Sequence, residues 1–527
     1  MMHSYLYRIM LSWLVCLLPL VACAAAPSKA ARPNIIVILA DDLGFSDLGC
    51  YGSEIHTPNI DSLARDGLRF SQFTNCALCG PSRAALMTGQ YPHRVGISNW
   101  TGLLNNRCVT LMELLKQAGY RTGAAGRLDM VTAENWHEPA NISKYVDRYL
   151  GSTGHTGPGN YFKDVRNTAF YRDGREFRLP EFNGYKTDVI TEFAEEFIAE
   201  TAAGPQPFFL YLAQYAPHWP LHAKEVDIAK YRELYRSLGW DNARTERHRR
   251  LIESGMIKPE TKLSPRDHRA VPWQEAKFKD WEAERMAVYA AQVDTLDQSV
   301  GRVMAALRRA RADSDTLVMF LSDNGASDQP MNSQLDQPAR TWRVDGTPTR
   351  VGNQPDIWPG PADNFVTAGP AWASVSNTPF RQHKQTNFEG GIASPLIAWW
   401  PGKINHAGSI SREITHITDI TATCLEVAGV AYPTEFDSRR IQPLTGKSLL
   451  PVLQGQPRKG HDMLFWATSG SRAVREGPWK LVSAKDGNWE LYDLDADPTE
   501  LCDLASVEPT RVEAMSQAFQ LWHRSEQ

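Results

Sequence analysis

Residues 79–89 read CGPSRAALMTG, and this stretch is the most informative part of the sequence. Pro81 suits the first position of a helix, where its missing N–H costs nothing, and Gly89 suits a helix exit. The stretch therefore predicts a helix that starts at Pro81, with Cys79 at its N-terminal end. The N–H groups and dipole at such an end favour an anion, so Cys79 is predicted to face one.

The same segment contains the spacing C-x-x-C, because Cys76 precedes Cys79 by three residues. Such pairs occur in disulfides, in redox sites and as half of a zinc site. No second C-x-x-C and no Cys/His cluster completes a zinc site, and no thioredoxin-like pattern surrounds the pair. A specialised role for Cys79 is therefore favoured over these three alternatives.

The composition is that of an ordinary globular protein. The chain has 527 residues, of which 42% are hydrophobic and 22% charged, so it is large enough for two or more domains. The formal net charge of −4 argues against a nucleic-acid partner, which would require a basic face.

The N-terminus has the pattern of an export signal over residues 1–23. Arg8 precedes an apolar run at residues 9–21, which is long enough for a signal core but short for a membrane span. Residues 20–23, LVAC, also fit a bacterial lipobox, in which Cys23 would carry a lipid anchor. Cleavage near residues 24–26 is the competing hypothesis. We therefore expect an exported protein, either periplasmic or anchored to the outer membrane as a lipoprotein.

Apolar runs alternate with helical patterns through most of the chain, which predicts an α/β fold. Residues 222–281 are rich in charge and predict short helices with a solvated surface, and residues 326–380 predict long ordered loops. Residues 32–445 are assigned to one catalytic domain with a large central, mostly parallel sheet flanked by helices. Its buried parallel strands are predicted at 35–40, 208–213, 316–322 and 396–400.

The pattern changes after about residue 446. Three short segments predict antiparallel strands, and the Asp486-Gly487 pair is a hairpin signal between the last two. We therefore assign residues 446–527 to a small C-terminal α+β subdomain with an antiparallel sheet. Its strands are expected at 472–475, 479–482 and 489–492, followed by a helix at 509–522.

Two carboxylate-rich pairs follow predicted strands. Asp41 and Asp42 come after the first strand, and Asp323 and Asn324 after the third. Open α/β sheets place ligands at the carboxyl ends of their strands. Three carboxylates and an amide suit a hard cation, Ca²⁺ or alternatively Mg²⁺, and lack the His or Cys typical of zinc. Simple turns are the competing interpretation of each pair taken alone.

Two further motifs carry groups suited to catalysis. The segment PHWP, residues 217–220, places His218 directly after the second predicted strand, although a lone His beside Pro is more often structural. Lys384 stands five residues before Glu389, which is followed by two glycines. An imidazole can pass a proton or hydrogen bond to a leaving oxygen.

Taken together, these motifs resemble those of the sulfatases: C-x-P-S-R, an Asp-Asp pair, Asp-Asn-Gly, P-H-x-P and K-x-x-x-x-E-G-G. The resemblance covers about residues 33–503 and implies the fold of the sulfatase branch of the alkaline phosphatase superfamily. It implies that a partner, either a formylglycine-generating enzyme or an anaerobic sulfatase-maturing enzyme, oxidises Cys79 to formylglycine. The hydrated aldehyde would attack the sulfur of a sulfate ester, and its second hydroxyl would later expel sulfate.

The resemblance also implies a role for each matched residue. Asp41, Asp42, Asp323, Asn324 and the modified Cys79 would hold the divalent metal. Lys384 would contact the sulfate and His218 the scissile ester. Arg83 would steady the hydrated aldehyde and pair with a metal-ligand carboxylate.

One segment departs from the family pattern. Where sulfatases usually have G-K-W-H, this chain has Gly126-Arg127-Leu128-Asp129. Arg127 keeps a cation, but a guanidinium is planar and an ammonium is not. Asp129 replaces an imidazole with a carboxylate, which is either the base that releases sulfate or the mark of a weakened site. His137 or His155 are further candidates for the missing imidazole.

The predicted function is therefore hydrolysis of sulfate esters by an arylsulfatase-like enzyme. Sulfated carbohydrates are one candidate substrate class, because Trp342, Trp358 and Trp372 lie in long loops and could stack on sugars. The alternatives are a phosphate or phosphonate ester hydrolase on the same fold and an inactive lipoprotein that binds sulfated glycans.

Overall fold

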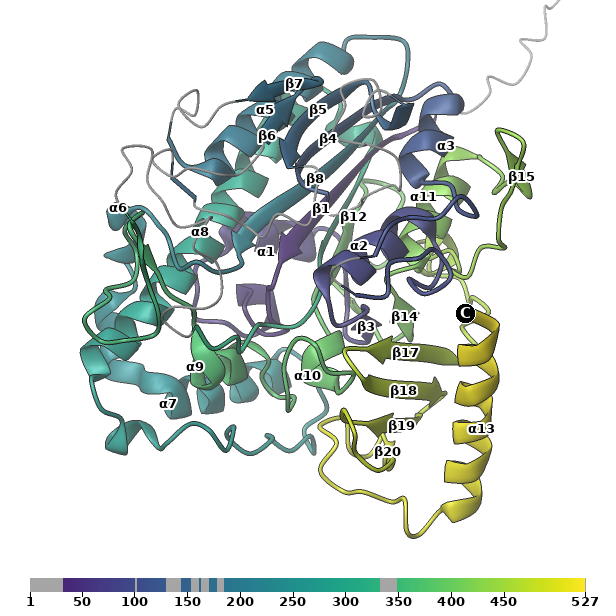
Figure 1. Ribbon diagram of the computed structural model, residues 1–527. Helices are drawn as coiled ribbons and strands as arrows, with labels where there is room; N and C mark the ends of the chain where they lie inside the picture. The colour runs from purple at the N-terminus through teal and green to yellow at the C-terminus, as the bar shows by residue number, and fades with distance from the viewer. Residues whose placement is uncertain are drawn as a thin grey trace, which may run out of the picture. The chain divides into compact units, whose positions relative to one another are not determined.

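The computed structural model describes residues 32–99, 102–128, 144–152, 161–162, 170–177, 184–331 and 348–526 (Figure 1). Pro33–Gln527 forms one compact unit. The predicted export signal and Cys23 lie outside the described residues. Within these residues, no helix combines the length and apolar character needed to cross a membrane.

The centre of the molecule is a large mixed sheet, as predicted. Five neighbouring strands in its middle, β9, β1, β8, β4 and β5, run parallel to one another. Their carboxyl ends meet at one edge. In the described part of the chain the sheet order is β13 (Ile410–Ser411), β2 (Leu68–Phe70), β12 (Leu396–Trp399), β9 (Thr316–Ser322), β1 (Asn34–Asp41), β8 (Phe208–Pro217), β4 (Arg121–Arg127), β5 (Arg148–Ser152), β6 (Phe170–Arg172) and β7 (Arg175–Phe177).

Helices cover both faces of this sheet (Figure 1). Alternate residues of β1 point to opposite faces: Ile36 and Ile38 lie in one core, and Ile35 and Val37 in the other. A strand with two buried faces is apolar throughout, which explains the unbroken run in the sequence. The first core includes α1 (Pro58–Arg65), α5 (Lys186–Thr201) and α8 (Lys279–Arg309); the second includes α2 (Cys79–Thr88), α3 (Leu111–Gln117) and α11 (Asp419–Ala428).

The predicted parallel strand at residues 396–400 is a strand, but its predicted direction is wrong. Strand β12 pairs antiparallel with β9. The chain is again beside the carboxyl end of β9 when β12 begins, since the Gly325 N–H donates to the Gly391 carbonyl at 3.0 Å. Strand β12 therefore starts at this edge and runs back through the sheet, whereas a parallel strand would require a crossover to the opposite edge.

Two other parts differ from the sequence expectation. Strand β4 was not predicted, because its sequence RTGAAGR lacks the branched and aromatic residues typical of strands. The charged region 222–281 contains the 22-residue helix α7 (Arg232–Glu253), which bends at Gly239 and buries Tyr235, Trp240 and Arg247. The region is thus part of the core and not only a solvated excursion.

Helix α2 begins two residues earlier than predicted. Cys79 is its first residue and Pro81 its third, while Gly89 ends it in the left-handed conformation with a φ of 65°. Proline is tolerated there because the first N–H groups of a helix have no partner within the helix. All ten residues of α2 are buried.

The remaining elements are short. They are η1 (Gly49–Tyr51), α6 (Glu225–Ile228), η3 (Trp273–Glu275), η4 (Asp313–Asp315), α9 (Gly369–Ser376), α10 (Glu389–Ile392), α12 (Leu450–Leu453) and the paired strands β3 (Phe73–Thr74) with β14 (Thr415–His416), β10 (Arg350–Val351) with β11 (Asn364–Phe365), and β15 (Glu435–Phe436) with β16 (Arg439–Arg440).

The C-terminal part contains the predicted antiparallel sheet and helix. Asp486 has a φ of 59° in the turn between the last two strands, where the hairpin signal was recognised. One face of the sheet packs on the terminal helix, and the other packs on Ala77, Phe388 and Ile392. The sheet order is β17 (Leu464–Thr468), β18 (Ser471–Glu476), β19 (Trp479–Ser483) and β20 (Glu490–Asp493), and the helix is α13 (Pro509–Glu526). The predicted boundary at residue 446 remains a proposal, since Pro33–Gln527 groups as one unit.

Candidate active site

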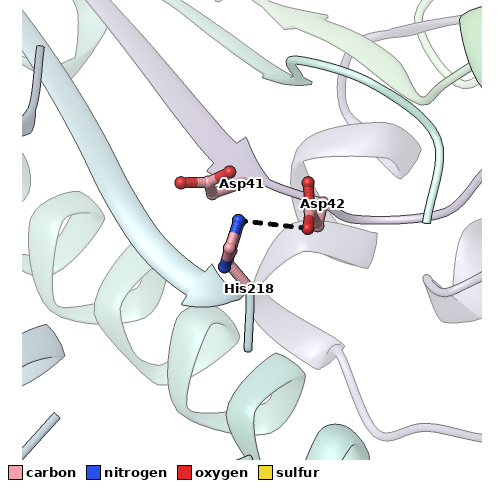
Figure 2. A group of neighbouring side chains, drawn as sticks. All are labelled: Asp41, Asp42 and His218. Atoms are coloured by element: carbon pink, nitrogen blue, oxygen red, sulfur yellow. Dashed lines mark ion pairs between the residues drawn. The ribbon is translucent and has the colours of Figure 1, made fainter. Parts of the chain in front are cut away.

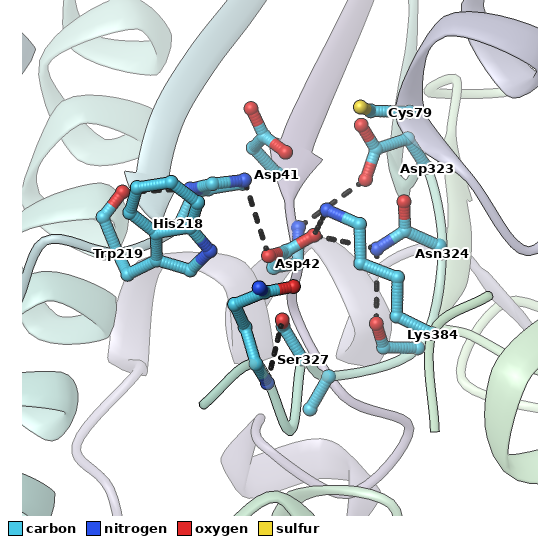
Figure 3. A network of polar contacts seen from close by, with 12 residues as sticks. Asp41, Asp42, Cys79, His218, Trp219, Asp323, Asn324, Ser327 and Lys384 are labelled. Carbon is cyan, nitrogen blue, oxygen red and sulfur yellow. Dashed lines mark hydrogen bonds and ion pairs between the residues drawn. The ribbon is translucent and has the colours of Figure 1, made fainter. Parts of the chain in front are cut away.

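Nine of the ten residues selected from the sequence gather at the carboxyl edge of the parallel strands, and Figure 3 labels all of them except Arg83 and Arg127. Each comes from the end of a strand, the start of α2 or the loop before α10. All nine side chains are buried. They are Asp41, Asp42, Cys79, Arg83, Arg127, His218, Asp323, Asn324 and Lys384. The tenth, Asp129, lies outside the described residues, as do His137 and His155.

The acidic residues form a close cluster with oxygen atoms that lack hydrogen-bond partners. Asn324 Nδ2 donates to Asp42 Oδ1 at 2.7 Å, and the Asp42 N–H donates to Asp323 Oδ1 at 3.2 Å. Among the described residues, Oδ1 of Asp41, Oδ2 of Asp42 and Oδ1 of Asn324 accept no hydrogen bond. A buried oxygen without a donor costs free energy, so these atoms are suited to binding a cation.

The donor atoms agree with a hard divalent metal ion. Ligand atoms of Asp41, Asp42 and His218 lie within 4.8 Å of one another (Figure 2). Carboxylate and amide oxygens predominate, as Ca²⁺ and Mg²⁺ prefer. The imidazole of His218 was not expected in this group, because the sequence placed it only at the scissile ester.

Three cations balance the three carboxylates. Arg127 Nη1 donates to Asp41 Oδ2 at 2.6 Å, and Arg83 Nη2 lies 2.7 Å from Asp323 Oδ2 and 3.2 Å from Asp41 Oδ2. Lys384 Nζ pairs with Asp42 Oδ1. The cluster is therefore close to neutral by itself, and a divalent cation would leave it with a positive charge that attracts an anion.

The ionisation of the acidic groups follows from this arrangement. Burial by itself raises the pKa of Asp41, but Arg127, His218 and Arg83 together hold that pKa below its usual range. Burial and the nearby Asp41 carboxylate raise the pKa of Asp323. Burial opposes the charge of Lys384, yet Asp42 holds its pKa above the ordinary value.

Cys79 lies within this charged environment. Its Sγ accepts a hydrogen bond from Arg127 Nη2 at 3.3 Å, and as the first residue of α2 it stands at a helix N-terminus. Arg83, one turn further on, donates to the Arg127 carbonyl as well as to Asp323. Arg127 therefore connects the side chain at position 79 directly to Asp41, and Arg83 links the Arg127 backbone to Asp323.

The orientation of His218 is set by its own chain. Its Nδ1 lies 2.7 Å from the Trp219 carbonyl, and since a carbonyl only accepts, Nδ1 carries the proton. Its Nε2 faces Asp42 Oδ2 at 3.4 Å. Burial lowers the pKa of His218 to about 4, although Asp42 and Asp41 act in the opposite direction. In the neutral form Nε2 therefore presents a lone pair, and proton donation requires the imidazolium form.

Comparison with known proteins identifies the family. The sulfatase family profile matches residues 33–430, and the profile of the N-sulphoglucosamine sulphohydrolase C-terminal region matches residues 382–522. An uncharacterized sulfatase of Schizosaccharomyces pombe is 32% identical, covering 94% of this chain and 93% of its own length. The arylsulfatase of Klebsiella aerogenes is 30% identical, covering 82% of this chain and 94% of its own.

The solved structures agree. The crystal structure of Ps i-CgsB superposes with a TM-score of 0.68 at 25% identity and covers 94% of both chains, and that protein is also known in complex with k-i-k-neocarrahexaose. The chain belongs to the sulfatase family, the enzymes that hydrolyse sulfuric esters.

Proposed function

We propose that this sulfatase releases sulfate from sulfated carbohydrates and uses a formylglycine made from Cys79. The observation that carries the proposal is the position of residue 79. It begins a buried helix and connects through Arg127 to Asp41, one of a cluster of residues with oxygens suited to a metal ion. When formed, the formylglycine would supply a geminal diol as the nucleophile.

The side chains around residue 79 have complementary tasks in this proposal. Arg127 and Lys384 bring positive charge to the sulfate oxygens, where negative charge develops during transfer. Arg83 holds Asp323 and Asp41 in place. Asp41, Asp42, Asp323 and Asn324 would hold the cation, for which we propose Ca²⁺. When bound, it would act as a Lewis acid toward a sulfate oxygen.

A sugar as the group that carries the sulfate is supported by two observations. The relative Ps i-CgsB binds an oligosaccharide. In this chain the Trp219 ring lies 4.8 Å from the His218 ring, centre to centre, and is only partly buried (Figure 3). Aromatic faces suit stacking against rings. Of the tryptophans proposed from the sequence, Trp372 is fully buried, Trp358 is 42% exposed and Trp342 lies outside the described residues.

The decisive experiment is mass spectrometry of the peptide that contains Cys79, after expression with a maturing enzyme. Formylglycine is expected as loss of the sulfur and appearance of an aldehyde that reacts with hydrazine reagents. An unmodified cysteine in an enzyme that turns over sulfate esters would refute the proposal. Comparing kcat/KM for sulfate and phosphate esters of the same aryl group tests the rival phosphoesterase, which the family match does not favour.

The alternative function, an inactive lipoprotein that binds sulfated glycans, rests on the departure from the family pattern at Arg127 and Asp129. If Asp129 takes the proton from the second hydroxyl of the diol, Asp129→Asn should slow sulfate release and leave a sulfated peptide at position 79. Wild-type turnover in Asp129→Asn would make Asp129 a bystander. Sulfated-glycan binding by the mature wild type without any turnover would favour the alternative.

Export remains part of the proposal. We infer a periplasmic or outer-membrane location from residues 1–23, with Cys23 as the lipidated residue. Palmitate labelling that disappears in Cys23→Ser is the expected result. A mature chain that begins after residue 24, 25 or 26 would instead indicate ordinary signal cleavage.

A further inference from the structure

Asp42, at the centre of the site, has an unusual backbone conformation. Its φ is 65°, in the left-handed region that residues with a Cβ rarely adopt. Such a conformation persists only where surrounding contacts determine it, and it concentrates at functional sites. The left-handed turn directs the Asp42 carboxylate toward Asn324 and Lys384. The question is which contacts hold it.

A second buried polar cluster lies directly behind this turn. Asp47 Oδ2 accepts hydrogen bonds from the Gly44 N–H at 2.8 Å and from the Tyr289 hydroxyl at 2.7 Å. The same hydroxyl lies 3.2 Å from the Asp42 carbonyl, so its single proton is shared between two acceptors and the bond to Asp47 is the shorter one. Burial and Asp47 raise the pKa of Tyr289 well above its ordinary value, so the hydroxyl keeps its proton. Asp47 and Tyr289 therefore contact the chain at two points, the carbonyl of Asp42 and the N–H of Gly44.

Arg247 holds Asp47 in turn. Its Nη1 donates to Asp47 Oδ1 at 2.6 Å, and its Nη2 and Nε contact Glu54 at 2.8 and 2.9 Å. Tyr235 completes the far end with a hydrogen bond to Glu54 Oε1 at 2.6 Å. We call the five residues Asp47, Glu54, Tyr235, Arg247 and Tyr289 the rear cluster. Through this cluster, side chains of α7 and α8 support the turn that contains Asp42.

Other contacts also restrict the turn at residues 42–46. A Cβ on Gly44 would lie 2.4 Å from the Ser376 carbonyl oxygen, so the backbones are in close contact there. The Ser46 N–H donates to the same carbonyl at 2.9 Å. On the opposite side, the Leu43 N–H donates to Ser322 Oγ at 3.1 Å. The backbone of Asp42 itself is contacted at both ends: its N–H donates to Asp323 Oδ1, and its carbonyl faces the Tyr289 hydroxyl.

We propose that Tyr289, held by Asp47 and Arg247, is a positioning residue that keeps Asp42 in its left-handed conformation and so sets the geometry of the cation site. The inference rests on the proposed cation site. It assigns a function to the charged region 222–281, because Arg247 of that region acts on the site through Asp47 without touching it.

The structure offers a matched pair of variants. Tyr289→Phe and Tyr235→Phe each remove one buried hydroxyl that donates to a carboxylate of the rear cluster. In the described residues, only the Tyr289 hydroxyl also reaches Asp42. The readout is the Ca²⁺ dissociation constant of the full-length purified protein, from competition with a chromophoric chelator, together with kcat and KM for an aryl sulfate.

For Tyr289→Phe we expect Ca²⁺ affinity to fall by about tenfold or more, as for other groups that orient metal ligands. At saturating Ca²⁺ we expect kcat to fall more than KM rises. Tyr235→Phe should keep the wild-type Ca²⁺ affinity within about twofold. Arg247→Lys keeps the charge but loses the forked guanidinium group. Its Ca²⁺ affinity should therefore lie between the affinities of the two tyrosine variants.

Three results would overturn the inference. Equal losses of Ca²⁺ affinity in both tyrosine variants would show a general effect of the rear cluster on the fold. Wild-type affinity in Tyr289→Phe would show that Asp42 is held without it. Absence of Ca²⁺ and Mg²⁺ binding by the wild type would remove the cation site itself, and therefore the proposed function's metal as well.

Discussion

The active site and the rear cluster are neighbouring groups of buried charge, yet they differ in one respect. Every side-chain nitrogen and oxygen of the rear cluster has a partner within the part of the chain that the structure describes, whereas three oxygens of the active site do not. Both groups are almost fully buried, and Tyr289 lies between them. Burial and charge by themselves therefore do not distinguish a site from a structural cluster.

The difference lies in how completely each group satisfies its own polar atoms. Carboxylates and guanidinium groups that saturate one another have nothing left to bind, and such a cluster contributes mainly to the uniqueness of the fold. Unsatisfied buried oxygens that lie close together, as those of Asp41 and Asp42 do, are instead suited to a ligand that completes them. Four predictions test this contrast, ordered by the size of the expected effect.

Cys79→Ala should have the largest effect, a loss of kcat of roughly 10⁴-fold or more, because no other side chain replaces the modified nucleophile. The fold should be retained, with a cost of about 1–2 kcal/mol for the lost buried sulfur. Turnover of an aryl sulfate and thermal melting measure both effects.

The matched control is Cys76→Ala, the other cysteine of the C-x-x-C pair. Its Sγ faces His416 Nε2 at 3.9 Å and is part of neither charged cluster. This variant should keep activity within a few-fold. Equal inactivation of the two variants would show that the pair acts jointly, against a single modified cysteine.

Removal of divalent metal should come next. Chelation is expected to lower kcat/KM by about 10³-fold, since a cation in such a site is worth several kcal/mol. Ca²⁺ should restore activity better than Mg²⁺, and elemental analysis should show one equivalent. Full activity after exhaustive chelation, or stoichiometric zinc, would show that the unsatisfied oxygens do not bind a hard divalent cation. The proposed difference between the two clusters would then be wrong.

Arg247→Met should break the rear cluster and cost about 3–5 kcal/mol of unfolding free energy, because it leaves two buried carboxylates without a counter-charge. Urea denaturation with and without Ca²⁺ is the measurement. The added cation should not restore the loss, since its ligands lie in the other cluster. A cost below about 1 kcal/mol would show that the rear cluster relaxes or admits water.

Arg127→Lys should give the smallest effect, about a tenfold loss of kcat/KM with little change in stability. One ammonium cannot contact Asp41 and Cys79 in the way the two guanidinium nitrogens do. A gain in activity would have a different meaning. It would show that the family's usual lysine is better here and that this chain has an impaired site.

Much of the site was predictable from short segments of sequence. Asp41-Asp42 and Asp323-Asn324 follow unbroken apolar runs, and parallel strands bring their ends to one edge whatever lies between them. The motif placed Cys79 at a helix start because Pro81 and Gly89 mark helix ends locally. These placements use only the chemistry of adjacent residues, which is why the sequence by itself determined them. The roles of the residues came from the resemblance of the motifs to those of the sulfatases.

Tertiary structure alone decided the rest. The direction of β12 is seen only in its antiparallel pairing with β9. The left-handed turn at Asp42 depends on Tyr289 and Asp47, and the burial of Arg247 depends on Glu54, almost two hundred positions earlier. Arg247 belongs to a segment so rich in charge that its composition predicts exposure to solvent. Composition reflects the free-energy cost of burying a charge, but it does not show which carboxylates will neutralise that charge in the folded protein. Those partners come from distant parts of the chain, and only the folded molecule brings them together.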